Sequence, residues 1–222
     1  EKGGNAFDAA VAMGFVLQVV EPHLNGPGGD LPAIIHDAQG DRVRVLCAQG
    51  PAPAGATIAH YRAEGLERIP GSGLLATVIP GAFDGWMLML RDHGTMTPRE
   101  VLEPAVHYAE AGHPLLWRVA QTIAGLADFF REEWPSSAET WLPGGHPPAA
   151  GALFRNPALA ETWRRILAEA ETVSGRAAQV EKARDAWAQG FVAETVGGWL
   201  ETAEAMDAAG GRRKGVLTAD DM

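Results

Sequence analysis

The sequence predicts one α+β domain over residues 1–222, with roughly half of its residues helical and a small pair of strands near the beginning. Three observations support this fold class. Apolar residues recur at helical spacing directly after capping residues near the start. Two short β-type segments flank Gly40. From Ala82 onward, capped helical segments dominate. A chain of this length buries about 70% of its unfolded surface, so its core needs no disulfide or metal.

The first predicted helix covers residues 6–20. Asn5 followed three residues later by Asp8 resembles a capping box, in which two side chains satisfy backbone N–H groups of the first turn. An apolar residue then recurs every fourth position from 11 to 19, which predicts a helix packed deep in the core. Pro22 and the glycines after it predict that the helix ends before them.

Residues 31–37 and 41–48 are predicted to form a β-hairpin around Gly40. The second segment alternates two sets of side chains: Val43, Val45 and Cys47 on one side, and Arg42, Arg44 and Leu46 on the other. This alternation predicts that one face of the hairpin is buried. Cys47 is expected to be a small buried apolar group, and as the only cysteine it excludes an intrachain disulfide.

The later helices have clear start signals. Thr97 as N-cap, Pro98 at the first helical position and Glu100 two residues further predict a helix that closes at Gly112. Asn156 as N-cap and Pro157 at the first helical position predict the start of another helix in the same way. Because Pro and Gly punctuate local structure, these signals predict separate helices joined by short loops.

Three further segments complete the prediction. Residues 82–94 are predicted to form a helix, and residues 180–211 one or two helices interrupted near Gly190 and Gly197. Residues 135–151 are rich in Pro, Gly and Ser and are predicted to form a loop.

Composition excludes several classes of partner. The formal net charge of -10 disfavours nucleic acid, because a polyanion is repelled. The longest nearly apolar run, residues 9–20, is shorter than the about 20 residues that a membrane span needs. The chain does not begin with Met, so we expect a processed or truncated product from which a leader could have been lost; the compartment stays open.

The stretch EPHLNGPGGD, residues 21–30, contains Gly26, Gly28 and Gly29. A phosphate-binding loop places its glycines directly ahead of a helix N-terminus, where backbone N–H groups face the anion. Here the glycines follow a helix and precede a strand, and Asp30 adds a negative charge. We therefore interpret the three glycines as a structural turn that brings a core helix and a strand together, not as catalytic residues.

Local patterns contain no complete active site. Ser72 lacks the G-x-S-x-G context because Pro70 stands where glycine is needed. Residues 71–76, GSGLLA, imitate a dinucleotide fingerprint only in part, since no clear strand precedes them. The seven histidines show no metal-ligand spacing, and His107 suits the surface of an amphipathic helix. These patterns predict no metal, no cofactor and no catalytic residue in the chain.

Four segments, in order over nearly the whole chain, resemble the γ-glutamyltranspeptidase family. KGGNAFDAAVAMGFVLQVVEPHLNGPGGD is similar to the family's KGGNAVDAAVA…VVEPHSSGIGGG. VIPGAFDGWMLMLRDHGTMTPREVLEPAVHYAEAGHPL is similar to its VPG…W…YG…W…L…PAI..AE.GFPV segment. GALFRNPALAETWRRILAEA and GVLTADDM match its later G..L.QP.LA.TL..IA and GLLT..DL segments.

The resemblance implies an N-terminal-nucleophile (Ntn) hydrolase of glutathione metabolism with a four-layer αββα sandwich. Such a precursor undergoes autoproteolysis into a large and a small subunit. The new N-terminal threonine of the small subunit is both nucleophile and, through its amine, base. The family's Thr-Thr-His-type motif does not occur here. We therefore expect this chain to be the helix-rich large-subunit portion, which supplies scaffold and one wall of the substrate cleft to a small-subunit partner.

One position departs from the family pattern. The large subunit typically contributes an arginine from a D-F-R-E-x-A-P stretch to bind the substrate α-carboxylate, and Gln49 of LCAQGPAP occupies that place. A neutral amide cannot copy a bidentate guanidinium–carboxylate pair. Either the enzyme acts on another acyl group, as an amidase or acylase of the cephalosporin or glutaryl-amide type, or another arginine, such as Arg42 or Arg44, substitutes. A third alternative is a relative that binds without catalysing.

Overall fold

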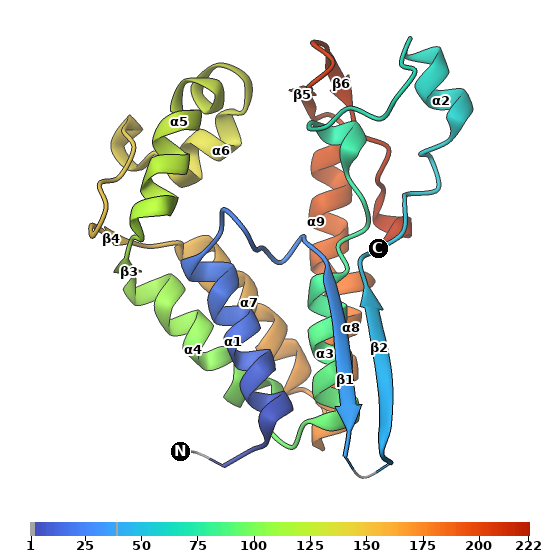
Figure 1. Cartoon of the computed structure of the whole chain (residues 1–222), viewed down its shortest axis with the longest axis vertical. Helices are drawn as coiled ribbons and strands as arrows, with labels where there is room; N and C mark the ends of the chain where they lie inside the picture. Colours follow the sequence, from blue (N-terminus) through green and yellow to red (C-terminus); the bar gives the residue numbers. More distant parts are fainter. Residues whose placement is uncertain (1–2, 39) are drawn as a thin grey trace.

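The structure, a computed structural model, describes residues 3–38 and 40–222. About half of these residues are helical, and three small two-stranded antiparallel sheets complete the fold: the hairpins β1–β2 and β5–β6, and the pair β3–β4, whose strands are separated by α5 and α6 (Figure 1). The helices are α1 (Ala6–Val20), α2 (Ile58–Ala63), α3 (Ala82–His93), α4 (Pro98–Ala111), α5 (Trp117–Glu133), α6 (Pro135–Trp141), α7 (Pro157–Ala170), α8 (Arg176–Ala188) and α9 (Phe191–Leu200). The strands are β1 (Leu31–Asp37), β2 (Arg42–Ala48), β3 (His113–Pro114), β4 (Leu153–Phe154), β5 (Glu204–Met206) and β6 (Arg212–Lys214). Within the described ranges, no helix combines the length and the apolar character that a membrane crossing requires.

The predicted first helix is confirmed as α1, with the reciprocal capping box between Asn5 and Asp8. The Asp8 carboxylate also accepts hydrogen bonds from the backbone N–H groups of Thr95 (2.8 Å) and Met96 (3.0 Å). One buried carboxylate therefore ties the start of α1 to the loop between α3 and α4. Burial by itself would raise the pKa of Asp8, but these hydrogen bonds outweigh it and hold the pKa below its usual value.

Most of the other predicted boundaries are confirmed. The helix α4 has Thr97 as N-cap with a capping box to Glu100, and α7 begins behind the Asn156 cap. One prediction is wrong: residues 135–151 are not simply a loop, because they contain α6 and a 3-10 turn at Pro143–Gly145. The chain breaks at Gly190, as predicted, whereas Gly197 lies inside α9.

The main core lies between α1, α3, α4, α7 and α8. Its centre is an aromatic cluster in which Phe83 stacks on Trp163 (5.7 Å) and on Trp187 (4.6 Å), while Phe15 meets Trp163 edge-on at 5.5 Å. Three of these rings are completely buried, and Trp187 is almost so. Such ring pairs add to the hydrophobic gain and hold α1, α3, α7 and α8 in register.

A smaller core lies under α5 and α6, at the upper left of Figure 1. It packs Val119 and Ile123 of α5 around Phe154 of β4, and Trp141 stacks on the Phe154 ring at 5.5 Å. Trp134 crosses to the β5–β6 hairpin, where its indole N–H donates to the Met206 carbonyl (3.1 Å). This lobe therefore has its own apolar cluster and a polar link to the last hairpin.

The β1–β2 hairpin is confirmed, although Gln39 of its turn lies outside the described residues. Its register pairs Ile34 with Val45 and His36 with Val43, so strand alternation separates two faces. The inner face, with Ala33, Ile35, Leu46 and Ala48, packs toward α3 and the main core. The outer face, with Pro32, Ile34, His36, Val43, Val45 and Cys47, is exposed.

The predicted burial of Cys47 is therefore wrong. Its thiol belongs to the outer face, where Ile34 is 81% exposed and Val43 and Val45 are each 69% exposed. The alternation correctly separated the two faces, but the face covered by protein is the one that carries Arg42, Arg44 and Leu46. The two-stranded ribbon is covered on the side where α3 packs against both of its strands.

Candidate functional site

The candidate site is a hollow at the end of β2, next to the position where the family pattern expects an arginine. Its volume is about 310 Å³. Four parts of the chain line it, with Met222 as a further lining residue: the end of β2 and the residues after it, the turn before α3, α3 and α8. The lining residues of these parts are Cys47, Ala48, Gly50, Pro51, Ile79, Pro80, Gly81, Asp84, Leu88, Arg184, Trp187 and Ala188. The site thus forms where a strand end, a helix start and a second helix meet.

Two glycines allow this close approach. Gly50 has a φ of 72°, and a Cβ there would collide with the Ile79 carbonyl oxygen. A Cβ on Gly81 would lie 2.5 Å from the Ala48 oxygen. The Ile79 N–H donates to the Pro51 carbonyl at 3.0 Å, which fastens the two loops to each other. Because only glycine fits such contacts, the backbone itself fixes the shape of the hollow.

Gln49 stands beside this hollow without lining it. Its side chain is exposed, and its Oε1 accepts a weak hydrogen bond from the Cys47 thiol at 3.5 Å. Strand alternation places both side chains on the outer side of β2. Gln49 therefore offers an uncharged amide at the open face of the molecule, where it cannot neutralise a carboxylate.

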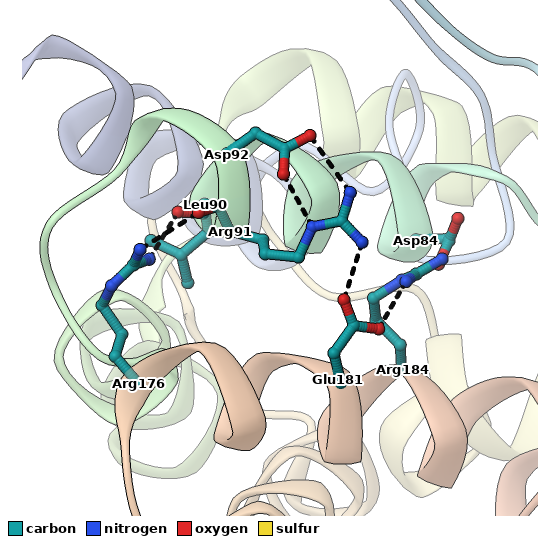
Figure 2. Close-up of polar contacts among 7 residues, drawn as sticks. All are labelled: Asp84, Leu90, Arg91, Asp92, Arg176, Glu181 and Arg184. Atoms are coloured by element: carbon teal, nitrogen blue, oxygen red, sulfur yellow. Dashed lines mark hydrogen bonds and ion pairs between the residues drawn. The ribbon is translucent and has the colours of Figure 1, made fainter.

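The guanidinium that does line the hollow belongs to Arg184 of α8. Its Nε donates to Asp84 Oδ1 (2.5 Å) and its Nη1 donates to Glu181 Oε2 (2.6 Å) (Figure 2). Its Nη2 has no hydrogen-bond partner among the described residues. One N–H edge of the planar group thus stays available while the other two contacts fix its orientation.

A chain of ion pairs holds Arg184 in place. Figure 2 shows Glu181 bridging Arg184 and Arg91, with Arg91 Nη1 donating to Glu181 Oε1 (2.7 Å) and Nε to Asp92 Oδ1 (2.7 Å). Arg176 donates to the Leu90 (2.7 Å) and Arg91 (3.0 Å) carbonyls, which lie in the last turn of α3. The network fastens α8 along α3.

The electrostatics of the network favour the ionised forms. Hydrogen bonding by Arg91 is the main cause that holds the pKa of Glu181 and of Asp92 below their usual values. The Asp84 carboxylate, more than any other partner, raises the pKa of Arg184. Because these groups are partly exposed, we treat the network as a positioning device and not as a large source of stability.

The structure answers part of the question about alternative arginines. Arg44 lies five residues before Gln49, about 16 Å along an extended strand. It pairs with Asp37 at 3.5 Å and lines a different hollow, with Asp92 and His93. Arg42 is exposed at the far end of β2. Neither reaches the hollow that Arg184 lines, and the sequence around Arg184 shows only an ordinary charged helix.

The glycine turn of residues 21–30 is a genuine turn, with the Gly29 N–H donating to the Gly26 carbonyl (3.0 Å). The Gly29 carbonyl accepts a hydrogen bond from the N–H of Ala82 at the start of α3 (2.9 Å). None of Gly26, Gly28 and Gly29 has a positive φ, and a Cβ on Gly28 would meet nothing within 4 Å. At the hollow itself, Gly50 and Gly81 are the glycines that close contacts require.

Histidines do not form a second site. His107 is exposed, as predicted, and His113 is buried at the base of the α5–α6 lobe, where burial lowers its pKa. In the part of the chain that the structure describes, no three His, Cys, Asp or Glu side chains gather as metal ligands would.

Comparisons with known proteins extend these observations. The family model for gamma-glutamyltranspeptidase matches residues 1–222. The oxamate amidohydrolase proenzyme of Klebsiella pneumoniae subsp. pneumoniae is 36% identical over 174 residues, which are 76% of this chain and 32% of that protein. The solved structure of LmbA2991T421A is 53% identical, with a TM-score of 0.95 over 99% of this chain and 37% of that one.

A cephalosporin acylase from Bacillus halodurans has the same fold, with 26% identity, a TM-score of 0.81, and coverage of 99% of this chain and 37% of that one. The present chain therefore spans about a third of the length of each of these three relatives. The predicted resemblance and the helix-rich Ntn-hydrolase fold class are confirmed. The chain belongs to the gamma-glutamyltranspeptidase family.

Proposed function

We propose that this chain is the large-subunit portion of an enzyme that transfers or hydrolyses acyl groups from amides, and that it supplies scaffold and one wall of the substrate cleft. The observation that carries the proposal is the family match over residues 1–222, which joins the fold to a family of amide-cleaving enzymes. The hollow beside Arg184 is the part of this chain that we assign to the cleft wall.

The reacting group in this proposal lies on a companion segment. The hydroxyl of an N-terminal threonine attacks the amide carbonyl, while the threonine amine accepts its proton. The C–N bond breaks, the proton passes to the leaving amine, and an ester links the acyl group to threonine. Water or an acceptor amine then attacks the ester and frees the threonine. Residues 1–222 take part by shaping the cleft.

The outer face of the β1–β2 hairpin is the docking surface that we propose for the companion segment. Ile34, Val43 and Val45 form an exposed apolar row on two edge strands. Exposed apolar faces of this kind favour association with another chain. The name of the related Klebsiella protein, a proenzyme, fits a precursor that is processed.

The substrate class follows from Gln49 and Arg184. Gln49 cannot hold a free α-carboxylate as the family arginine does, and hydrogen bonds to charged groups contribute about 1.5–3 kcal/mol. Arg184 lines the neighbouring hollow, but Asp84 neutralises much of its charge. This arrangement favours the second candidate function, an acylase or amidase that acts on acyl groups other than γ-glutamyl. A γ-glutamyl substrate is the reference against which its activity is compared.

Substrate comparison tests the proposal. The complete protein would be assayed on γ-glutamyl anilides and on glutaryl and other acyl amides. Turnover of an acyl amide ahead of the γ-glutamyl anilide supports the altered specificity, and ordinary turnover of the γ-glutamyl class alone rejects it. No turnover of any amide, with one uncut polypeptide by intact-mass spectrometry, would favour a non-catalytic binding relative.

A further inference from the structure

A small apolar hollow lies between α5 and the turn that follows α1, and it shares no lining residue with the hollow beside Arg184. One stripe of α5, including Val119, Ile123, Leu126 and Phe130, forms its main wall. These positions recur at helical spacing, so one face of α5 is turned toward the hollow. Val119 and Ile123 are buried at its base, whereas Leu126 is 40% exposed at its rim.

The volume of the hollow, about 210 Å³, suits a molecule with one ring. An apolar cavity of about 150 Å³ holds benzene, so this hollow has room for a ring and one small substituent. The rings of Phe130 and Trp141 form part of its lining, and Trp141 is held in place by stacking on Phe154 at 5.5 Å. Aromatic walls favour an aromatic guest, because offset and edge-on ring pairs add to the gain from burial.

Two polar groups interrupt the apolar lining. The Thr122 hydroxyl donates to the Arg118 carbonyl (3.0 Å), which leaves its oxygen free to accept a hydrogen bond. His23, from the glycine-turn stretch, has its Nδ1 shielded from water without a hydrogen-bond partner among the described residues. The Thr122 oxygen therefore suits a guest that donates a hydrogen bond.

The lining residues carry no carboxylate, ammonium or guanidinium group. A carboxylate guest would lose hydration here without a cation to replace it, which is unfavourable. An uncharged guest with one O–H or N–H group meets no such cost. From size, ring contacts and the accepting Thr122 oxygen together, we propose that this hollow binds phenol-class molecules: a single aromatic ring that carries a hydroxyl group.

Binding of phenol to the purified protein tests the proposal, with toluene and benzoate as comparison probes and calorimetry or ligand-observed NMR as the readout. We expect saturable phenol binding, about fivefold tighter than toluene because of one hydrogen bond. Benzoate is expected to bind at least tenfold more weakly than phenol, on the order of the cost of one unpaired polar group. Absence of saturable phenol binding, or tighter binding of benzoate, would overturn the proposal.

Three variants locate the site. Leu126→Trp fills the hollow and is expected to abolish phenol binding, whereas Phe129→Trp, on the same helix but outside the lining, is expected to leave it unchanged. Thr122→Val keeps the shape and removes the accepting oxygen, so it should weaken phenol about fivefold and leave toluene unchanged. Circular dichroism confirms that each variant is folded. Equal phenol binding by Leu126→Trp and the wild type would place any binding elsewhere and overturn the proposal.

Discussion

The two faces of the β1–β2 hairpin have similar side chains but opposite environments. On the inner face, Ile35 is 6% exposed and packs with Leu46 on the main core. On the outer face, the paired residues Ile34 and Val45 are 81% and 69% exposed. Residue type alone therefore does not decide burial here; the deciding factor is that α3 covers one face only.

This difference distinguishes the face that stabilises the fold of the chain itself from the face that is exposed for contact with a partner. The inner face is fixed by close backbone contacts at Gly81 and by packing of Gly85 against Ala48 of β2 and Leu31 of β1. The outer face contributes little to the stability of these residues, because its apolar side chains stay in water. We interpret the inner face as scaffold and the outer face as an interface.

The largest effect is expected from Gly85→Val on the inner face. A Cβ at this position collides with the Ala48 Cβ and lies 3.1 Å from Leu31 Cδ2. Because a branched side chain must push α3 away from the hairpin, we expect a loss of about 3 kcal/mol in the free energy of unfolding. Urea denaturation measures it, with Gly125→Val, on open helix surface, as the control. If Gly85→Val lost less unfolding free energy than Gly125→Val, the inner face would not be tightly packed.

The second effect concerns the outer face. Val45→Lys should keep the free energy of unfolding of residues 1–222 within about 0.5 kcal/mol of the wild-type value, because the side chain is 69% exposed. It should weaken association with the companion segment about tenfold, since a charge replaces an apolar contact. Titration calorimetry or pull-down of the separated segments measures the association. Unchanged association would remove the outer face from the proposed interface.

Low pH should weaken the contacts between α3 and α8. The folded-state pKa of Glu181 lies below the usual 4.5, mainly because of hydrogen bonding by Arg91. A lowered pKa means that its stabilisation is present above about pH 4.5 and is lost as the pH falls through the folded-state value. The wild type should thus lose more stability than Glu181→Gln between about pH 6 and pH 3. Exposed Glu194→Gln is the control and should follow the wild type.

The smallest effect is expected from Gly28→Ala in the glycine turn. Gly28 has no positive φ and no atom within 4 Å of the added Cβ, so alanine fits without strain. We expect a gain of about 0.5 kcal/mol, because alanine reduces the freedom of the unfolded chain. Thermal melting curves of Gly28→Ala, Gly50→Ala and the wild type check this; Gly50→Ala should be clearly destabilised. A loss of stability of more than about 1 kcal/mol in Gly28→Ala would show that the turn needs glycine.

The predictable features are those with local causes. The bounds of α1 follow from the capping pair Asn5 and Asp8 at one end and Pro22 at the other, so sequence reading found them directly. The helix α6 has no such signal, because it begins at Pro135 behind Trp134, which provides no side-chain cap. Its Trp141 stacks on Phe154, a tertiary contact that no local pattern contains. Local rules thus succeed where caps act and fail where packing decides.

The candidate site was predictable only in part. The departure at Gln49 could be seen because a family motif gave an expected residue at that position. Arg184 could not be found in the same way, since it lies 135 residues further along the chain in an ordinary charged helix, and only the packing of α8 on α3 brings it to the hollow. Likewise, alternation separated the faces of β2 without telling which one α3 covers.

Amide hydrolysis by the purified 222 residues alone, compared with the same residues supplied with the companion segment, tests the central claim most directly. The account predicts that residues 1–222 alone release no product above the uncatalysed rate, and that the complete assembly does, because the attacking hydroxyl comes from the companion. Hydrolysis by residues 1–222 alone, at a rate comparable to the assembly, would contradict it.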